Sequence, residues 1–244
     1  PVGYQLAGFF ICPDKINALV CGKVKPSAVS ELGAILGCQD RKIRFITTPS
    51  NTNEKPTCEA EVDCEAAVTC LAVYDEHQEN GVQIVYGTSQ GHVAIIGAAA
   101  NKQPSPDSPP VITSKLMDFQ KKAEGISQIH VGKFAGDESD TKQVIIGRDG
   151  GHVEIWNVTL AIGPDGNVRR DAVPLHSASL NESIRGLGMG VITSGSSDQK
   201  FNYTDFVVAS YSGSIVAFSC NPAASDATGS ALQDETEGVE EKCS

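Results

Sequence analysis

The stretch VIIGRDGGHVEIW, residues 144–156, joins two apolar arms through a glycine-rich run. Runs of this kind occur in phosphate-binding loops, in calcium loops and in hairpin turns. A phosphate-binding loop leads from a strand into a helix, whereas this run leads into HVEIW, where apolar and polar residues alternate as in a half-buried strand. The sequence therefore predicts a β-hairpin whose turn lies at the glycines.

Three other segments align with this hairpin, which indicates an internal repeat. They are AILGCQDRKIRFI (34–46), IVYGTSQGHVAII (84–96) and FVVASYSGSIVAF (206–218). A further apolar strand is expected before each hairpin, at 16–24, 68–75, 126–134 and 184–192. Weaker fourth strands are expected at 58–64, at 111–119 and, less clearly because Pro174 interrupts the pattern, within 169–180.

Four antiparallel strands per unit, repeated around an axis, are typical of a β-propeller blade. The predicted fold class is therefore all-β, a β-propeller of which about four four-stranded blades are present. The predicted blades cover residues 14–66, 67–120, 121–180 and 181–220.

Six aligned glycines are the candidate structural residues, and we predict that all of them belong to the hairpin turns. One set lies at one aligned position, with Ala209 in the fourth copy: Gly37, Gly87 and Gly147. The other set lies four residues later, where a left-handed residue would follow a type I turn: Gly91, Gly151 and Gly213. Arg41 replaces this glycine in the first copy, so its turn either differs or carries strain.

The charge of the chain excludes an obvious nucleic-acid role. Nineteen Lys and Arg residues stand against thirty Asp and Glu, a formal net charge of −11, and binding to phosphate backbones needs clustered basic residues. The densest basic cluster, Arg41, Lys42 and Arg44, lies within a strand pattern. Residues 221–244 hold six acids and one lysine, so we expect an acidic, flexible tail or a nascent helix.

Eight cysteines occur without a C-x-x-C pair, mostly in apolar strands. Free cysteine in such a context behaves as a small hydrophobic residue, so we expect a reducing, intracellular compartment. Cys58, Cys64 and Cys70 recur every six residues without a nearby histidine, which disfavours a zinc site. We see no signal-like N-terminus and no apolar run long enough to cross a bilayer.

No catalytic motif is present, and the polar candidates favour structural roles. His92 and His152 occupy equivalent repeat positions and are expected to share a packing environment rather than a metal. Asp137, Glu138 and Asp140 are the nearest approach to a calcium loop, but they lack the required glycine spacing. The Pro- and Ser-rich insertion 98–110 is expected to form an exposed loop. No cofactor is expected.

One family resemblance makes the prediction more specific. Asp14-Lys15-Ile16-Asn17, followed by Cys38-Gln39-Asp40-Arg41, resembles the propeller of the Bardet–Biedl syndrome 7 protein family, whose members are BBSome subunits. YGTSQGHVAII, VIIGRDGGHVEIW, LNESI (180–184) and VVASYSG (207–213) are similar to later hairpins of that propeller. The resemblance runs from about residue 14 to residue 220.

The resemblance implies a seven-bladed N-terminal propeller of which this chain holds the later blades. Residues 1–13 would then supply the outer strand of a preceding blade, and 221–244 would lead toward a coiled coil. It further implies a non-catalytic scaffold subunit of a coat complex that moves ciliary membrane proteins and is recruited to membranes by an Arf-like GTPase. Sister subunits, notably the subunit 2 type, would be its partners, and its location would be the cytoplasm, cilium and basal body.

Two other architectures remain open from the sequence. In the first, GYQLAGFFI (3–11) supplies the last outer strand and closes a self-contained four-bladed ring, which would act as a ligand-binding module or a channel-site enzyme. The second, an integrin-like propeller that binds calcium, is disfavoured because the D-x-D-G loops that it needs are absent from the sequence. An incomplete propeller, by contrast, would expose two blade faces, and we expect such a fragment to self-associate through them.

Overall fold

The computed structural model describes residues 9–25, 31–47, 55–77, 81–100, 111–119, 121–132, 142–162, 168–190 and 205–218. These residues form fifteen β-strands in four antiparallel sheets. Among them no helix is long and apolar enough to cross a membrane. The all-β prediction is confirmed.

Each sheet is one blade, and its strands are neighbours in chain order. The first blade contains β1 (Ile16–Lys25), β2 (Glu31–Cys38), β3 (Lys42–Thr47) and β4 (Thr57–Asp63). The second contains β5 (Val68–His77), β6 (Gly81–Thr88), β7 (Val93–Ala100) and β8 (Val111–Asp118). The third contains β9 (Ile126–Gly132), β10 (Lys142–Arg148), β11 (His152–Ile162) and β12 (Val168–Ser179). The described part of the fourth contains β13 (Ile184–Gly190), β14 (Asp205–Ser210) and β15 (Ile215–Phe218).

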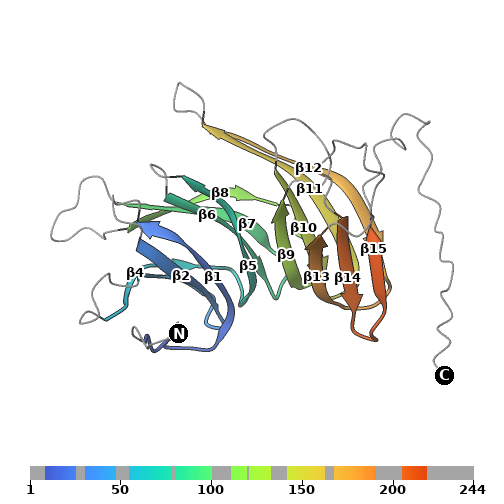
Figure 1. Ribbon diagram of the computed structural model, residues 1–244, viewed down its shortest axis with the longest axis horizontal. Helices are drawn as coiled ribbons and strands as arrows, with labels where there is room; N and C mark the ends of the chain where they lie inside the picture. Colours follow the sequence, from blue (N-terminus) through green and yellow to red (C-terminus); the bar gives the residue numbers. More distant parts are fainter. Residues whose placement is uncertain are drawn as a thin grey trace, which may run out of the picture.

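The blades stack in chain order along an arc, with the first and the fourth at its two ends (Figure 1). The first strands of the blades, β1, β5, β9 and β13, contact one another in succession and form the inner side of the stack. The described sheets therefore form an open arc and not the closed four-bladed ring that the sequence left possible.

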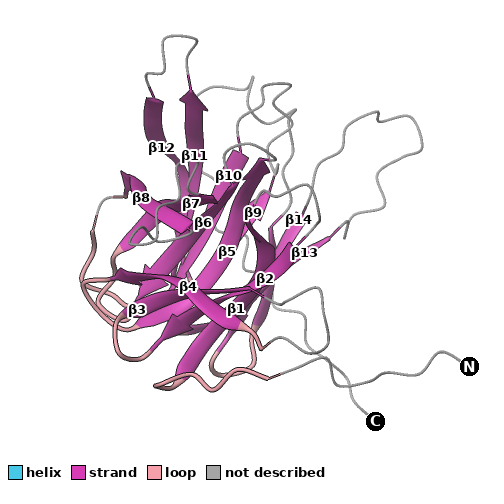
Figure 2. Cartoon of the chain, turned by 90° about the vertical axis from the view of Figure 1, so that its left-hand side faces the viewer, coloured by secondary structure: helices cyan, strands magenta, loops and turns pink. Residues whose placement is uncertain are grey.

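The fourth strand of the third blade, which the sequence left uncertain within 169–180, is present in the structure as β12. Its pairing with β11 shifts between Ile155, opposite His176, and Trp156, opposite Pro174, so that Leu175 is the extra residue of a β-bulge. Proline is tolerated here because β12 is an edge strand of its sheet. Together β11 and β12 extend as a ribbon beyond the body of the stack (Figure 2).

The hairpin turns contain four residues with a left-handed backbone. Gly91, Gly151 and Gly213 have φ angles of 81°, 91° and 95°, a region that glycine enters without steric cost. Arg41 occupies the same position in the first blade with φ of 65°. The first hairpin therefore keeps the turn of the others and carries the backbone strain of a non-glycine residue.

The prediction that Gly37, Gly87 and Gly147 belong to the turns is wrong. These glycines lie within β2, β6 and β10, and each is packed against the next blade. A Cβ atom on Gly87 would lie 2.5 Å from Cγ2 of Ile126. The corresponding distances are 2.6 Å from Gly37 to Cγ1 of Val68 and 2.9 Å from Gly147 to Cγ2 of Ile184. Glycine is present because a side chain would occupy the space of the neighbouring strand.

Val68, Ile126 and Ile184 are each the first residue of an inner strand, and all three are completely buried. We call them the blade anchors. They lie in three apolar cores, one between each pair of successive blades. The equivalent first residue of β1, Ile16, is 43% exposed because no described blade precedes it.

Several sequence predictions fall outside the described residues. These are residues 1–8 of the expected outer strand at 1–13, most of the 98–110 insertion, the acidic residues 137–140, and the tail 221–244. Of the described residues in 1–13, Phe10 and Cys12 pack against Leu36, Cys38 and Ile46 of the first blade.

Because Gly87 is packed against the next blade, we predict that one added methyl group there lowers the stability of the fold. Gly87→Ala would place its Cβ within 2.5 Å of Ile126 and 2.8 Å of the Cys70 sulfur, and we expect it to lower the free energy of unfolding by roughly 1–3 kcal/mol through overpacking. Gly188→Ala in β13 is the control, since an added Cβ there meets nothing within 4 Å. Urea unfolding of both variants measures the difference, and equal midpoints would contradict the packing described.

Candidate interaction surface

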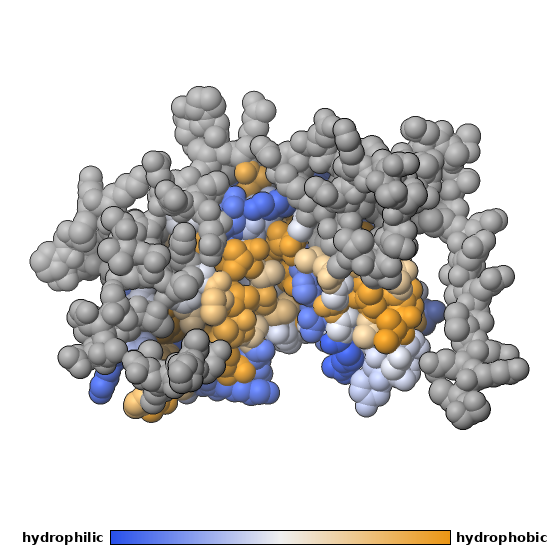
Figure 3. Space-filling model, viewed as in Figure 1, coloured by the Kyte–Doolittle hydropathy of each residue, from blue (hydrophilic) through white to orange (hydrophobic). Residues whose placement is uncertain are grey.

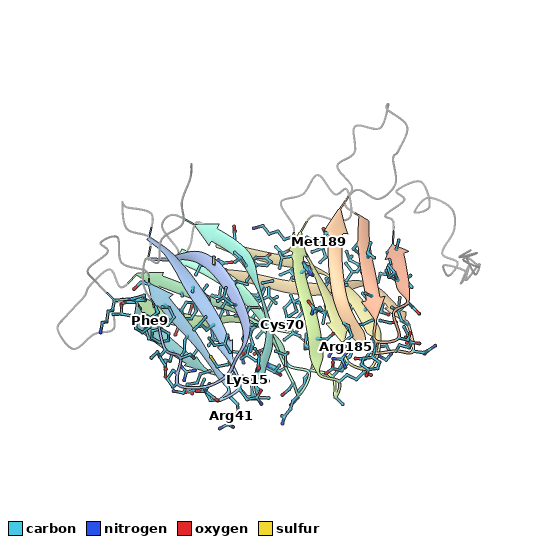
Figure 4. The ribbon with its side chains drawn as sticks, turned by 60° about the horizontal axis from the view of Figure 1, so that its bottom comes forward. Phe9, Lys15, Arg41, Cys70, Arg185 and Met189 are labelled. Carbon is cyan, nitrogen blue, oxygen red and sulfur yellow. The ribbon has the colours of Figure 1, made fainter. Side chains whose placement is uncertain are left out.

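One edge of the stack carries the features that repeat in every blade. It consists of the hairpin turns and of the incoming loops, the segments that lead into each inner strand, and we call it the tip edge. A backbone N–H of each turn donates to a carbonyl of the incoming loop at 2.9 Å. The pairs are Gln39 to Lys15, Ser89 to Ala67, Asp149 to Gly125 and Tyr211 to Ser183. Figure 4 shows Lys15, Arg41 and Arg185 on this edge and Met189 at the opposite end of β13.

An acidic residue of the incoming loop binds the hairpin in three blades. In the second, Glu65 lies 2.7 Å from Nδ1 of His92, and in the third, Glu124 lies 2.8 Å from Nδ1 of His152. The two histidines thus share an acidic partner from the incoming loop, but His92 is buried whereas His152 is partly exposed. In the fourth blade, which has Ser214 at that position, Ser210 donates to Glu182 at 2.6 Å.

The third blade contains the most deeply buried charges. Glu154 accepts hydrogen bonds from Arg148 Nε at 2.8 Å, from Lys122 Nζ at 2.5 Å and from the Trp156 indole at 3.0 Å. Arg148 and Glu154 are almost completely buried, whereas Lys122 reaches solvent. Burial alone would raise the pKa of Glu154, but these hydrogen bonds outweigh it and hold the pKa below its ordinary value.

The first blade uses the opposite arrangement, with a buried cation between two carboxylates. Arg44 pairs with Asp40 and, at 2.8 Å, with Glu61. The hydrogen bond from Arg44 lowers the pKa of Asp40, and the hydrogen bond from Lys42 lowers that of Glu61. Two residues of the densest basic cluster, Lys42 and Arg44, thus supply ion pairs within a blade, whereas Arg41 is exposed in the turn.

A second set of polar contacts joins the inner strands. Nδ2 of Asn17 donates to the carbonyl of Val68 at 3.0 Å, and Oγ1 of Thr69 donates to that of Ile126 at 2.6 Å. Each donor is the second residue of an inner strand and binds the anchor residue of the next blade. Arg185 takes this position in β13, and its side chain is exposed.

Arg185 and Tyr211 form the most exposed aromatic feature of the tip edge. The guanidinium carbon of Arg185 lies 5.1 Å from the centre of the Tyr211 ring, a cation–π contact. The two residues line an open pocket of about 440 Å³ together with Glu182, Ser183 and Ser212. Tyr211 is 75% exposed. Tyrosine and arginine are enriched among residues that dominate protein–protein binding, so this pocket is suited to contact with another protein.

The two ends of the arc expose apolar side chains. At the first blade, Leu19 is 57% exposed, and at the fourth, Ile215 is 72% exposed. The space-filling view shows apolar areas over β1 and β5 and over β14 and β15 (Figure 3). Apolar areas of this kind are typical of surfaces that contact other proteins.

The cysteines give no metal site within the described residues, in which no cluster of His, Cys, Asp and Glu could hold a metal ion. Cys64 and Cys70 are buried, and Cys58 is exposed. Burial raises the pKa of Cys64 and of Cys70 to about 12.

The sequence prediction missed the acidic residues of the incoming loops. Glu124 and Glu182 stand two residues before their blade anchors, Asp14 stands two before Ile16, and Glu65 stands three before Val68. An acidic residue at this near-constant distance before a β-branched residue is the signal that could have identified the tip edge.

A succession of blades with shared inner-strand contacts and repeated tip-edge bonds defines a partial β-propeller. The family model of the BBS7 β-propeller matches residues 5–220. The chain belongs to the BBS7 β-propeller family.

The chain is similar to several solved structures. The crystal structure of Saccharomyces cerevisiae Sqt1 is 15% identical with a TM-score of 0.53, and the match covers 85% of this chain and 46% of that one. For the Myceliophteria thermophila Cps50 (Swd1) β-propeller domain the identity is 11%, the TM-score 0.48 and the coverage 84% and 54%. For BBS1N in complex with ARL6DN the values are 13%, 0.47, 83% and 53%.

This chain therefore spans about half the length of the solved chains that it matches. No curated protein sequence matches it.

We predict that removing the buried carboxylate of Glu154 lowers the stability of the fold and changes how that stability depends on pH. Glu154→Gln would leave Arg148 buried without a counter-charge, and we expect a loss of roughly 3 kcal/mol in the free energy of unfolding at neutral pH. Because folding lowers the pKa of Glu154 from its ordinary 4.5, its carboxylate stabilises the fold fully above that pH. This contribution is lost as the pH falls through the lower folded pKa.

The variant should therefore lose less stability than the parent chain on acidification from about pH 5 to pH 3, measured by urea unfolding at each pH. Asp171→Asn, at an exposed position of β12, is the control and should stay within about 0.5 kcal/mol of the parent. Parallel curves for Glu154→Gln and the parent chain would contradict the ion cluster.

Proposed function

We propose that this chain is the propeller part of a non-catalytic scaffold subunit of the BBSome, which carries membrane proteins into and out of cilia. The observation that carries the proposal is the match of the BBS7 β-propeller family over residues 5–220. On this proposal the protein acts in the cytoplasm, at the basal body and in the cilium, and it needs no cofactor.

The use of charge in the blades supports a binding role over a catalytic one. The most buried charged groups, Arg44, Arg148 and Glu154, are engaged in ion pairs. Arg148 pairs with Glu154 within one hairpin, Glu154 also pairs with Lys122 of the incoming loop, and Arg44 pairs with Glu61 of the outer strand β4. Charges held in this way stabilise a rigid frame. The groups that remain exposed, such as Arg185 and Tyr211, suit contacts with protein surfaces.

The partners on this proposal are sister subunits of the same complex, notably the subunit 2 type. Contact with membranes and with ciliary cargo would be indirect, through the assembled complex, and nucleic acid would not bind, in keeping with the net charge of −11. A rigid stack fixes the relative position of tip-edge residues from different blades, so that several anchors can engage one partner at once.

Affinity capture of the full-length parent protein from ciliated cells tests this role. We expect a stoichiometric set of propeller and coiled-coil subunits of the BBSome to be recovered and identified by mass spectrometry. Full-length protein carrying Gly87→Ala should recover less of this set because its blades stack poorly, whereas Gly188→Ala should recover as much as the parent. A folded parent protein that recovers none of these subunits would contradict the proposal.

We further propose that the isolated 244-residue chain self-associates through its end faces, since Leu19 and Ile215 are exposed there. Light scattering should show a molar mass that rises with concentration, and Leu19→Glu should shift the chain toward the monomer. Val173→Glu is the control, because Val173 is similarly exposed but lies on the outer strand β12. A strictly monomeric chain at high concentration would overturn this proposal.

A further inference from the structure

Two cysteines from separate segments lie side by side at the first blade. Sγ of Cys12, in the segment before β1, is 3.6 Å from Sγ of Cys38, at the end of β2. Both are free thiols. The two sulfurs are in van der Waals contact, and a disulfide bond of about 2.0 Å requires them to approach by about 1.6 Å.

The surroundings hold this pair together. Phe10 and Cys12 pack against an apolar cluster of Leu36, Cys38 and Ile46, on the side of the first blade that faces away from the second. Cys38 is completely buried, whereas Cys12 is partly exposed. Nη1 of Arg44 lies 3.9 Å from the sulfur of Cys12, so a positive charge stands next to both thiols.

No other described cysteine has this arrangement. The sulfurs of Cys58 and Cys64 contact backbone carbonyls, and that of Cys70 contacts the hydroxyl of Thr69. Cys21 is exposed on the inner strand β1. Within the described part of the chain, the Cys12–Cys38 pair is thus the one place where two thiols meet.

We propose that Cys12 and Cys38 form a reversible disulfide when the chain meets a low-molecular-weight disulfide such as oxidised glutathione. The linkage would tie the segment 9–15 to β2 and fix it over the apolar surface formed by Leu36 and Ile46. The site is therefore a redox modification site at the end face of the stack, where the incoming loop of the first blade meets the end of β2.

The chemistry proceeds by two thiol–disulfide exchanges. The thiolate of Cys12 attacks one sulfur of oxidised glutathione, which forms a mixed disulfide and releases one glutathione thiolate. The thiolate of Cys38 then attacks the Cys12 sulfur and releases the second glutathione. Two protein thiols are oxidised, one glutathione disulfide is reduced to two thiols, and the two protons pass to the departing thiolates.

Exposure decides the order of these steps. Burial is the main reason that the pKa of Cys38 is raised to about 11, so this thiol is almost fully protonated at neutral pH and cannot be reached by glutathione. Cys12 is the partner that solvent reaches. Arg44 opposes the effect of burial on Cys38, and its charge would stabilise the thiolate in the second exchange.

Mass spectrometry of the 244-residue chain after incubation with oxidised glutathione tests the proposal. We expect a peptide pair linked through Cys12 and Cys38, its loss on addition of a reducing thiol, and a higher melting temperature for the oxidised chain because the cross-link restricts the unfolded state. Cys12→Ser should abolish both the linkage and the rise in melting temperature. This variant leaves the buried Cys38 in place, so it is expected to fold.

Cys58→Ser is the matched control and should keep the linkage and the rise in melting temperature. A second measurement is hydrogen exchange, which should slow at residues 9–15 on oxidation in the parent chain and not in Cys12→Ser. Glutathione that remains attached to Cys12, a linkage of Cys12 to Cys58, or two unmodified thiols would each overturn the proposal.

Discussion

The contact of each blade anchor with a glycine of the preceding blade is the interaction on which the stack depends. Val68, Ile126 and Ile184 are completely buried where their strands begin, and the glycines beneath them have no room for a Cβ. This contact brings the inner strand of one blade against the middle of the previous sheet. The three interblade cores and the bonds from Asn17 and Thr69 then form around it.

The same geometry explains where binding surfaces are found. Between the blades the anchors and apolar side chains are buried by packing, and near the tip edge the buried charges form pairs such as Arg148 with Glu154. Two kinds of surface stay open to contact with other proteins. They are the two ends of the arc, where Ile16 and Ile215 are exposed, and the Arg185–Tyr211 pocket. On the proposed function, these are the surfaces that partner proteins would contact.

Much of the fold could be predicted from the sequence because each blade repeats a strand alternation and a turn glycine. The roles of Gly37, Gly87 and Gly147 could not be predicted. A glycine that a turn requires and a glycine that a neighbouring strand requires look the same in the sequence. Arg41 is an exception to the expectation that glycine occupies the left-handed turn position. The other contacts of the hairpin keep this backbone conformation despite its cost. The contacts of Glu65 and Glu124 with histidines, and of Glu182 with Ser210, could not be predicted because the sequence does not show which loop lies beside which hairpin.

A double-mutant cycle between Gly87 and Ile126 tests the central contact most directly. Urea unfolding is measured for the parent chain, Gly87→Ala, Ile126→Ala and the double variant. The account predicts that the methyl group at residue 87 costs less stability once Ile126 is truncated, because the contact with Cγ2 at 2.5 Å is removed while those with Cβ of residue 126 and with the Cys70 sulfur remain. We expect a coupling of about 1 kcal/mol. Additive losses in the double variant would contradict the claim that the anchor and the glycine hold the blades together.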